Sequence, residues 1–254
     1  MRSFVAFTKK EIMESVRTYK FMILFLIFVV FGFLNPVMAK VLPEILESVL
    51  PEGMTITLEE PKAIDSWMQF FKNGAQTGMI VLTVIFSGIM AGEISKGTLI
   101  HMVTKGLSRK VVVLSKFTSA VFQWTLSYAA SALITLGYTL YFFEKMELPN
   151  LFLGILGMWI FGVLLLSMVI FGGLLFKNVY GALLLAGGAA LILTLLGLFP
   201  DLKPYNPMTL VSENVNLMTE MFSSGDFLLS AGVAVLLTGL LLVISMSNTL
   251  KITE

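Results

Sequence analysis

Residues 151–199 read "LFLGILGMWIFGVLLLSMVIFGGLLFKNVYGALLLAGGAALILTLLGLF", and Lys177 is their only charged residue. A helix needs about 20 mostly apolar residues to cross the hydrocarbon core of a membrane. This stretch holds two such runs, 151–176 and 179–199, joined by the short connection "KNVY" (177–180). Lipid admits helices or closed barrels, and the runs show no two-residue alternation, so they predict two neighbouring transmembrane helices.

The rest of the chain repeats this pattern. Further apolar runs lie at 21–41, 74–92, 117–143 and 227–247. The chain has 254 residues, of which 57% are hydrophobic and 13% charged, whereas about 25% of a soluble domain is charged. We therefore expect an all-α polytopic membrane protein with six transmembrane helices, forming a single transmembrane domain over 1–254.

The first apolar run is too long for a signal peptide and is expected to stay in the protein. Asn35-Pro36, near its outer end, is interpreted as a helix terminus. The chain has no cysteine, which excludes disulfides, thiolate metal sites and cysteine nucleophiles.

The distribution of lysine and arginine predicts the orientation. With the N-terminus in the cytoplasm, the outer side holds five of the 17 basic residues, namely Lys40, Lys62, Lys72, Lys145 and Lys203. The other twelve then lie inside, as the positive-inside rule requires. We expect a multi-pass protein of the cell membrane with both termini in the cytoplasm and outer loops at 43–73 and 200–226. Within the second outer loop, residues 208–222 have near-helical apolar spacing, which predicts a short amphipathic helix before the last span.

The N-terminal segment, residues 1–20, predicts a helix lying flat on the inner leaflet. One stripe of this helix is apolar and consists of Val5, Ile12, Val16 and Tyr19. Its charged residues face elsewhere, which is the pattern of an interfacial amphipathic helix. The alternative is an ordinary solvated helix.

Several kinds of chemistry are missing from the sequence. No charged residue lies near the middle of a predicted span, although coupled transporters need such a charge or broken helices. His101 is the only histidine and no Gly-Lys dipeptide occurs, so a histidine pair for a metal and a phosphate-binding loop are both excluded. We expect no catalytic residue, metal site, cofactor or nucleic-acid partner. If the chain transports, its energy must come from a cytoplasmic partner.

The segment 93–110, between the second and third spans, is the candidate contact for that partner. Its first part, "EISKGTLIHMV" (93–103), has helical spacing, and Gly106 is expected to break the helix. Ser108 is a plausible N-cap for the next helix, whose first turn carries Arg109 and Lys110. A short helix with an apolar face suits a groove in a partner; the alternative is an inner loop that satisfies the positive-inside bias.

The order of residues here resembles a known family. "E-x-x-x-G-T-L" at 93–99, Ser108-Arg109, Lys116 and "YNPMTL" (205–210) are similar to the pattern of the type-two family of ABC-transporter permeases. Family members often have a proline before the Ser-Arg pair, where this chain has Lys105-Gly106.

The resemblance implies that 93–110 is a coupling region that docks on a separate ABC ATPase. The implied contacts are Glu93, Lys96, Gly97, Thr98, Leu99, His101, Met102, Ser108 and Arg109. Gly97 would allow close packing, and Leu99 and Met102 would fill the ATPase groove. The full transporter would contain two ATPase copies, which bind ATP and Mg, and two permeases, either a homodimer or a pair with a sister permease.

The expected function is export of a hydrophobic or amphipathic substrate. Many Phe and Met residues and few charges in the spans suit an adaptable apolar path. An antimicrobial or cytolytic peptide and a lipophilic drug are candidate cargoes. Two alternatives remain open: a membrane anchor or sensor that recruits a cytoplasmic partner, and a secondary transporter or channel. The sequence contains no filter-like motif or charged ring that would favour a channel.

Overall fold

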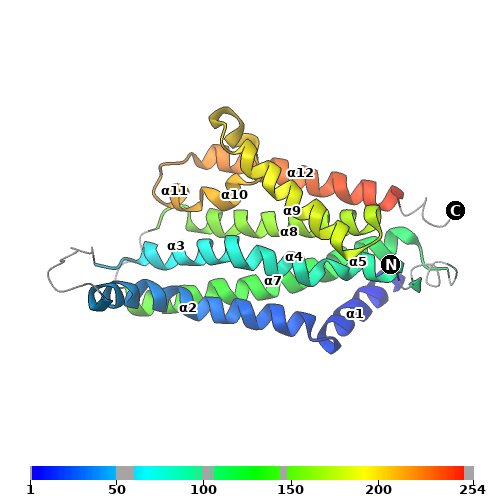
Figure 1. Cartoon of the computed structure of the whole chain (residues 1–254), viewed down its shortest axis with the longest axis horizontal. Helices are drawn as coiled ribbons and strands as arrows, with labels where there is room; N and C mark the ends of the chain where they lie inside the picture. Colours follow the sequence, from blue (N-terminus) through cyan, green and yellow to red (C-terminus); the bar gives the residue numbers. More distant parts are fainter. Residues whose placement is uncertain are drawn as a thin grey trace.

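The computed structural model describes residues 2–49, 60–95, 97–98, 104, 106–143 and 148–248. Every regular element in these ranges is a helix, and most run along the long axis of the molecule (Figure 1). The helices are α1 (Arg2–Arg17), α2 (Lys20–Val49), α3 (Ala63–Asn73), η1 (Gly74–Gly78), α4 (Met79–Phe86), α5 (Gly88–Ser95), α7 (Arg109–Phe142), α8 (Leu151–Phe176), α9 (Val179–Leu196), η2 (Pro200–Tyr205), α10 (Thr209–Ser212), α11 (Asn214–Met218) and α12 (Ser224–Asn248). Of these, η1 is a π-helix and η2 a 3₁₀-helix.

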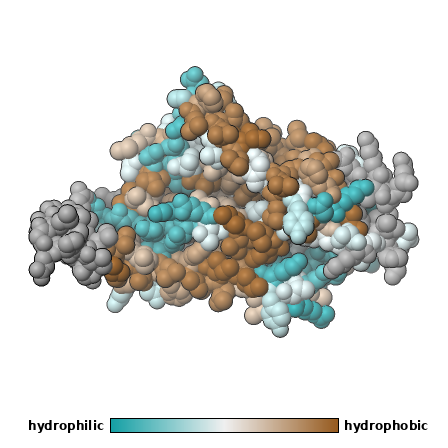
Figure 2. All heavy atoms as spheres, viewed as in Figure 1, coloured by the Kyte–Doolittle hydropathy of each residue, from teal (hydrophilic) through white to brown (hydrophobic). Residues whose placement is uncertain are grey.

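Five helical stretches are long and apolar enough to cross a membrane. They are Lys20–Leu42, Ala63–Ser95, Leu151–Phe176, Val179–Leu196 and Ser224–Ser247. Hydrophobic residues cover much of the visible surface between more hydrophilic clusters (Figure 2). The protein is therefore a multi-pass helical membrane protein, as predicted.

The centre of the bundle is α8. Of its most apolar stretch, 67% is buried inside the protein, against 17% for α9. Glycines let aromatic rings lie directly on its backbone: a Cβ at Gly162 would come within 2.5 Å of the Trp124 indole, and one at Gly157 within 2.4 Å of the Phe227 ring. The bounds of α8 agree with the predicted span 151–176 because the run is uniformly apolar.

The tight turn predicted between α8 and α9 is confirmed. Lys177 has φ 58°, and its backbone N–H donates to the Gly173 carbonyl, which is a left-handed helix terminus. Asn178 then caps α9, because its side-chain oxygen accepts from the backbone N–H of Gly181 at 2.7 Å. The two helices therefore lie antiparallel with only a short connection.

Helix α7 differs from its neighbours because one of its faces is polar. Seven buried residues recur at every fourth position: Ser115, Ser119, Gln123, Ser127, Ser131, Thr135 and Thr139. This face contacts α1, α2 and α3; for example, Ser66 and Thr139 share a hydrogen bond of 2.6 Å, and Thr135 donates to the Gly32 carbonyl. The helix begins at Arg109, eight residues before the predicted span 117–143.

The expected helix end at Asn35-Pro36 is wrong, because α2 continues through Pro36 to Val49. Asn35 is fully buried, and its Oδ1 accepts a hydrogen bond from Nδ2 of Asn73 at 2.7 Å. Proline is tolerated inside membrane helices where neighbouring groups satisfy the freed backbone. The outer segment predicted at 43–73 consequently contains the end of α2 and the whole of α3.

The second outer segment, 200–226, also folds into helices. Two short ones, α10 and α11, replace the single amphipathic helix that was predicted, and the break lies at Glu213. Leu210 and Leu217 are fully buried in the core cluster, and both helices lie beside α8 (Figure 1). Tertiary burial against α8, rather than contact with lipid, accounts for the apolar pattern of this segment.

Candidate functional site

A group of charged side chains gathers where α1, α5 and α7 meet, near the N-terminus. The ammonium group of Lys116 on α7 is 2.8 Å from Oε2 of Glu11 and 3.1 Å from Oε1 of Glu93. The Lys116 side chain is 2% exposed, and those of Glu11 and Glu93 are 8% and 13% exposed. A charge this buried is stable only when it is paired. The inner cluster, as we call Glu11, Glu93, Lys116 and Lys10, therefore joins three helices.

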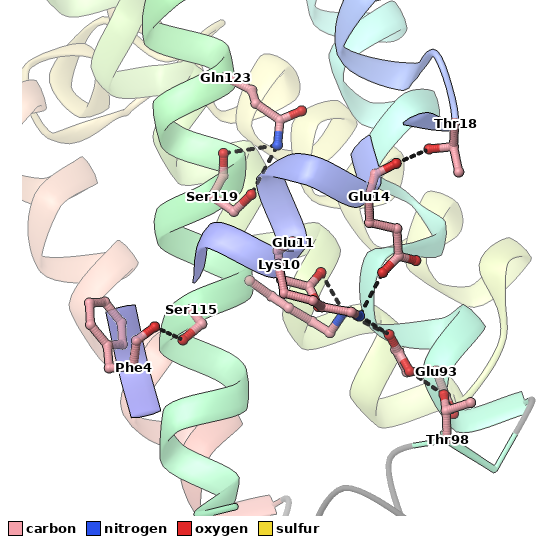
Figure 3. Close-up of polar contacts among 11 residues, drawn as sticks. Phe4, Lys10, Glu11, Glu14, Thr18, Glu93, Thr98, Ser115, Ser119 and Gln123 are labelled. Atoms are coloured by element: carbon pink, nitrogen blue, oxygen red, sulfur yellow. Dashed lines mark hydrogen bonds and ion pairs between the residues drawn. The ribbon is translucent and has the colours of Figure 1, made fainter. Parts of the chain in front are cut away.

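Lys10 lies on the more exposed side of the inner cluster. Its Nζ lies 2.6 Å from Glu14, 3.1 Å from Glu11 and 3.8 Å from Glu93, and Figure 3 shows the three carboxylates turned toward it. Burial alone would lower the pKa of Lys10, but hydrogen bonds and charges from Glu14 and Glu11 outweigh burial and raise it. Lys10 therefore stays charged at any physiological pH.

The segment after α5 is tied to the same cluster. The hydroxyl of Thr98 donates both to the Glu93 carboxylate and, at 3.1 Å, to the Glu93 carbonyl (Figure 3). Gly97 lies between them with φ 68°, and its backbone N–H donates to the Ile94 carbonyl at 3.1 Å. A left-handed residue of this kind ends a helix, and glycine adopts it without strain. Among the described residues, no atom lies within 4 Å of a Cβ added at Gly97, so the visible reason for glycine is its conformation.

The second half of the predicted coupling region leads into α7. Gly106 has φ 88°, in agreement with the expected break, and α7 begins at Arg109. Ser108 occupies the N-cap position, although its side chain makes no capping hydrogen bond. Lys96, Leu99, His101 and Met102 lie outside the described residues.

The helix α1 is fixed to α7 by a second set of polar contacts, on the polar face of α7. Figure 3 shows the bonds of Ser115 to Phe4 and of Gln123 to Ser119. The Ser15 hydroxyl donates to Gln123, whose Nε2 donates to the Ser119 hydroxyl at 3.0 Å. Ser115 donates to the Phe4 carbonyl at 3.3 Å. The buried face of α1 is thus polar.

The apolar stripe predicted for residues 1–20 is not buried in the protein. The predicted helix is too long, because α1 ends at Arg17 and Tyr19 lies in the following turn with φ 61°. Val5 and Tyr19 are each 64% exposed, Val16 is 41% exposed, and Ile12 is partly exposed. Their exposure leaves the stripe free to contact lipid, and its position on the inner leaflet stays a prediction.

A pair joining Glu11 to Lys116 was not predicted from the sequence. The two residues are 105 positions apart, and sequence periodicity gives no information about such a contact. One signal was available: Glu11 and Ser15, four residues apart, share one face of α1 beside the apolar stripe, and a polar face on an amphipathic helix that is buried requires a polar partner.

The three carboxylates of Glu11, Glu14 and Glu93 lie close enough together to hold a metal ion, within 4.8 Å of one another. Each of them is already bonded to Lys10 or Lys116. The ammonium groups supply the positive charge that a metal would otherwise bring, so the geometry favours a structural ion-pair network.

The "YNPMTL" motif lies at the opposite end of the bundle, where its side chains make hydrogen bonds that connect neighbouring helices. Asn206 donates to the Leu193 carbonyl at 2.7 Å, and Thr209 donates to the Lys203 carbonyl at 2.7 Å. Lys203 also pairs with Glu213 at 2.8 Å. Burial alone would raise the pKa of Glu213, but bonds from Lys203 and Asn216 outweigh it and lower the pKa. The motif therefore anchors η2 and α10 to the end of α9.

No protein-family model matches the chain, and no curated protein matches it.

Proposed function

We propose that this chain is the membrane permease subunit of an ATP-driven exporter of the type-two ABC family. A separate ATPase subunit, in two copies, would bind ATP and Mg and supply the energy. Two permease chains, identical or sister, would form the transport path in the cell membrane, with both termini of each chain in the cytoplasm. The chain itself would carry no catalytic residue.

The observation that carries this proposal is the inner cluster. Glu93 bonds both to Thr98, within the segment that would dock on the ATPase, and to Lys116 on α7. Lys116 in turn bonds to Glu11 on α1. Displacement of residues 96–105 by an ATPase would therefore pull on α1 and α7 together, because buried ion pairs resist separation.

In this proposal α7 also crosses the membrane, which brings the number of spans to six; in chain order it is the third. It has 34 residues, which at 1.5 Å per residue exceeds the thickness of a bilayer. It runs beside α2 and α8 along the bundle (Figure 1). Its polar face is turned toward other helices, so the polar side chains would be kept away from lipid.

The cargo would be hydrophobic or amphipathic, such as an antimicrobial or cytolytic peptide or a lipophilic drug. Support comes from the spans, which carry many Phe and Met side chains and no charge near their centres. Flexible methionine-rich surfaces adapt to varied apolar ligands.

The experiment is co-purification in detergent with the ATPase encoded nearest to this gene. Wild type is compared with a Leu99→Asp/Met102→Asp double variant. The matched control is Leu202→Asp/Met221→Asp, because both side chains are exposed near the other end of the bundle. We expect the ATPase to bind wild type and the control and to be lost from the first variant.

A second measurement tests the transmission of force. Glu93→Gln should still retain the ATPase but should reduce ATP-dependent export into inverted vesicles, because its links to Lys116 and Thr98 are weakened. If no ATPase binds wild type, or if both double variants retain it equally, the permease assignment is wrong. Retention of an ATPase without any ATP-dependent export would favour the anchor or sensor function.

A further inference from the structure

A cavity of 630 Å³ opens beside the inner cluster, between α1, the α4–α5 helix and α7, with Lys20 of α2 also in its lining. Small-molecule sites usually have volumes of roughly 300–1,000 Å³. Its lining combines charged groups from α1 with apolar side chains from α4 and α5, including Ile85 and Ile89. A ligand that fits this lining must be amphipathic.

The charged side chains that line the cavity sum to zero net charge, but the negative and positive charges lie in different parts of it. Lys10 and Lys116 are both bonded to carboxylates, so the group formed with Glu11, Glu14 and Glu93 carries one net negative charge. Glu14 bonds to Lys10 through Oε2 alone, and its side chain is 52% exposed.

Lys20 supplies the opposite charge. It also lines the cavity and is exposed, and among the described residues it makes no ion pair. The cavity thus offers a negative region beside Glu14 and a positive one at Lys20. This arrangement complements a zwitterion.

The wall formed by α4 and α5 connects the cavity to the membrane. Ile80, Val84, Gly88 and Gly92 are spaced four residues apart and so follow one face of this helix. Ile80 and Val84 are 64% and 54% exposed. Among the described residues, a Cβ at Gly92 would meet no atom within 4 Å, and one at Gly88 would meet only Val179, at 3.9 Å. The face is therefore apolar at membrane depth and bare beside the charged cavity.

From these observations we infer that the cavity binds one phospholipid with a zwitterionic, primary-ammonium headgroup, of the phosphatidylethanolamine class. The ammonium group donates to Glu14 at the edge of the inner cluster. The phosphate lies at Lys20, and an acyl chain follows Ile80 and Val84. This inference does not depend on the proposed transport function.

The test uses the purified, delipidated full chain in detergent and needs no ATPase. Native mass spectrometry would follow titration with short-chain phosphatidylethanolamine, phosphatidylcholine and phosphatidylglycerol. We expect one phosphatidylethanolamine per chain, bound about fivefold or more tightly than phosphatidylglycerol, which has no ammonium group. Phosphatidylcholine should bind in between, because its quaternary ammonium has the charge but donates no hydrogen bond.

Three variants test the cavity itself and the two headgroup contacts. Gly92→Leu fills the cavity without altering a charge and should abolish saturable binding. The matched control is Gly137→Leu, since Gly137 is exposed and also has no atom of the described part of the chain within 4 Å of its added Cβ. Glu14→Gln and Lys20→Ala should each weaken binding by roughly threefold to fivefold. Lys9→Ala, an exposed lysine of α1 that does not line the cavity, should leave binding unchanged.

Free phosphoethanolamine separates a lipid site from a site for a soluble zwitterion. It should not bind measurably, because it lacks the acyl chain that contacts Ile80 and Val84. The inference is overturned if phosphatidylglycerol binds as tightly as phosphatidylethanolamine, if Gly92→Leu binds like wild type, or if phosphoethanolamine competes as well as the lipid. Dodecylamine, which has the ammonium but no phosphate, should bind Lys20→Ala no more weakly than wild type. The phosphate contact is overturned if Lys20→Ala binds phosphatidylethanolamine as tightly as wild type, or if it weakens the binding of dodecylamine as much as that of the lipid.

Discussion

Replacing Lys116 by methionine should expose how strongly the inner cluster holds the bundle together. Methionine keeps most of the length and volume of the lysine side chain and removes its charge. The change leaves Glu11 and Glu93 facing each other, with side chains only 8% and 13% exposed. Lys10 is then the one remaining cation of the cluster, at 3.1 Å from Glu11 and 3.8 Å from Glu93.

The expected loss is about 3 kcal/mol in the free energy of unfolding. Removing one partner of a buried ion pair costs roughly 3–5 kcal/mol, because the other charge stays buried without compensation. The low end applies here because Lys10 still neutralises part of the carboxylate charge. A triple variant, Glu11→Gln/Lys116→Met/Glu93→Gln, removes all three charges and should recover stability to within about 1 kcal/mol of wild type.

Unfolding in mixed micelles, followed by far-UV circular dichroism, measures these differences. Lys9→Met is the control, since Lys9 is an exposed lysine of the same helix and makes none of the cluster's ion pairs, and its effect should stay within about 0.5 kcal/mol. If Lys116→Met loses less than about 1 kcal/mol, or if the triple variant is no more stable than the single one, the cluster does not hold these helices together as argued.

Two further changes test the close packing at Gly162 of α8 and the ion pair between Lys203 and Glu213. Gly162→Ala should cost about 1–3 kcal/mol in detergent thermal unfolding, because its Cβ would lie 2.5 Å from the buried Trp124 ring. Gly239→Ala, whose Cβ would meet no described atom within 4 Å, should cost nothing. Equal melting temperatures of the two variants would contradict the close approach at Gly162. Glu213 has a lowered pKa, so its pairing with Lys203 stabilises the fold fully above about pH 4.3, the ordinary glutamate pKa, and this stability is lost as pH falls through the lowered value. Glu213→Gln should therefore be less stable than wild type at pH 7, with the difference shrinking in acid; a difference independent of pH would refute the pairing.

The uniformly apolar parts of the fold could be predicted from the sequence. The bounds of α8 agree with its predicted span, and α9 begins where expected, because long apolar runs in lipid leave the backbone no alternative to a helix. The beginning of α7 near Ser108 was likewise signalled by local residues.

Features that depend on contacts between distant segments were predicted less well. Pro36 is a helix breaker by local rules, yet α2 passes through it because the surrounding helices determine the outcome. The residues of the polar face on α7 are regularly spaced in the sequence, but only the structure shows that α1, α2 and α3 cover them.

In the candidate site, the sequence identified Glu93, Gly97, Thr98 and Ser108 as residues of interest. It did not predict that Glu11 would meet Lys116, since that contact forms only when α1 folds back onto α7.

The polar face of α7 also has a consequence for the biosynthesis of the protein. Serine, threonine and glutamine at every fourth position make α7 less hydrophobic than the five helices that qualify as spans by composition. Membrane insertion depends on the hydrophobicity of each segment as it is presented to the translocon. If α7 crosses the bilayer as proposed, it is the segment least able to enter alone. Its insertion then requires helices made earlier, above all α2, whose backbone at Gly32 accepts a hydrogen bond from Thr135.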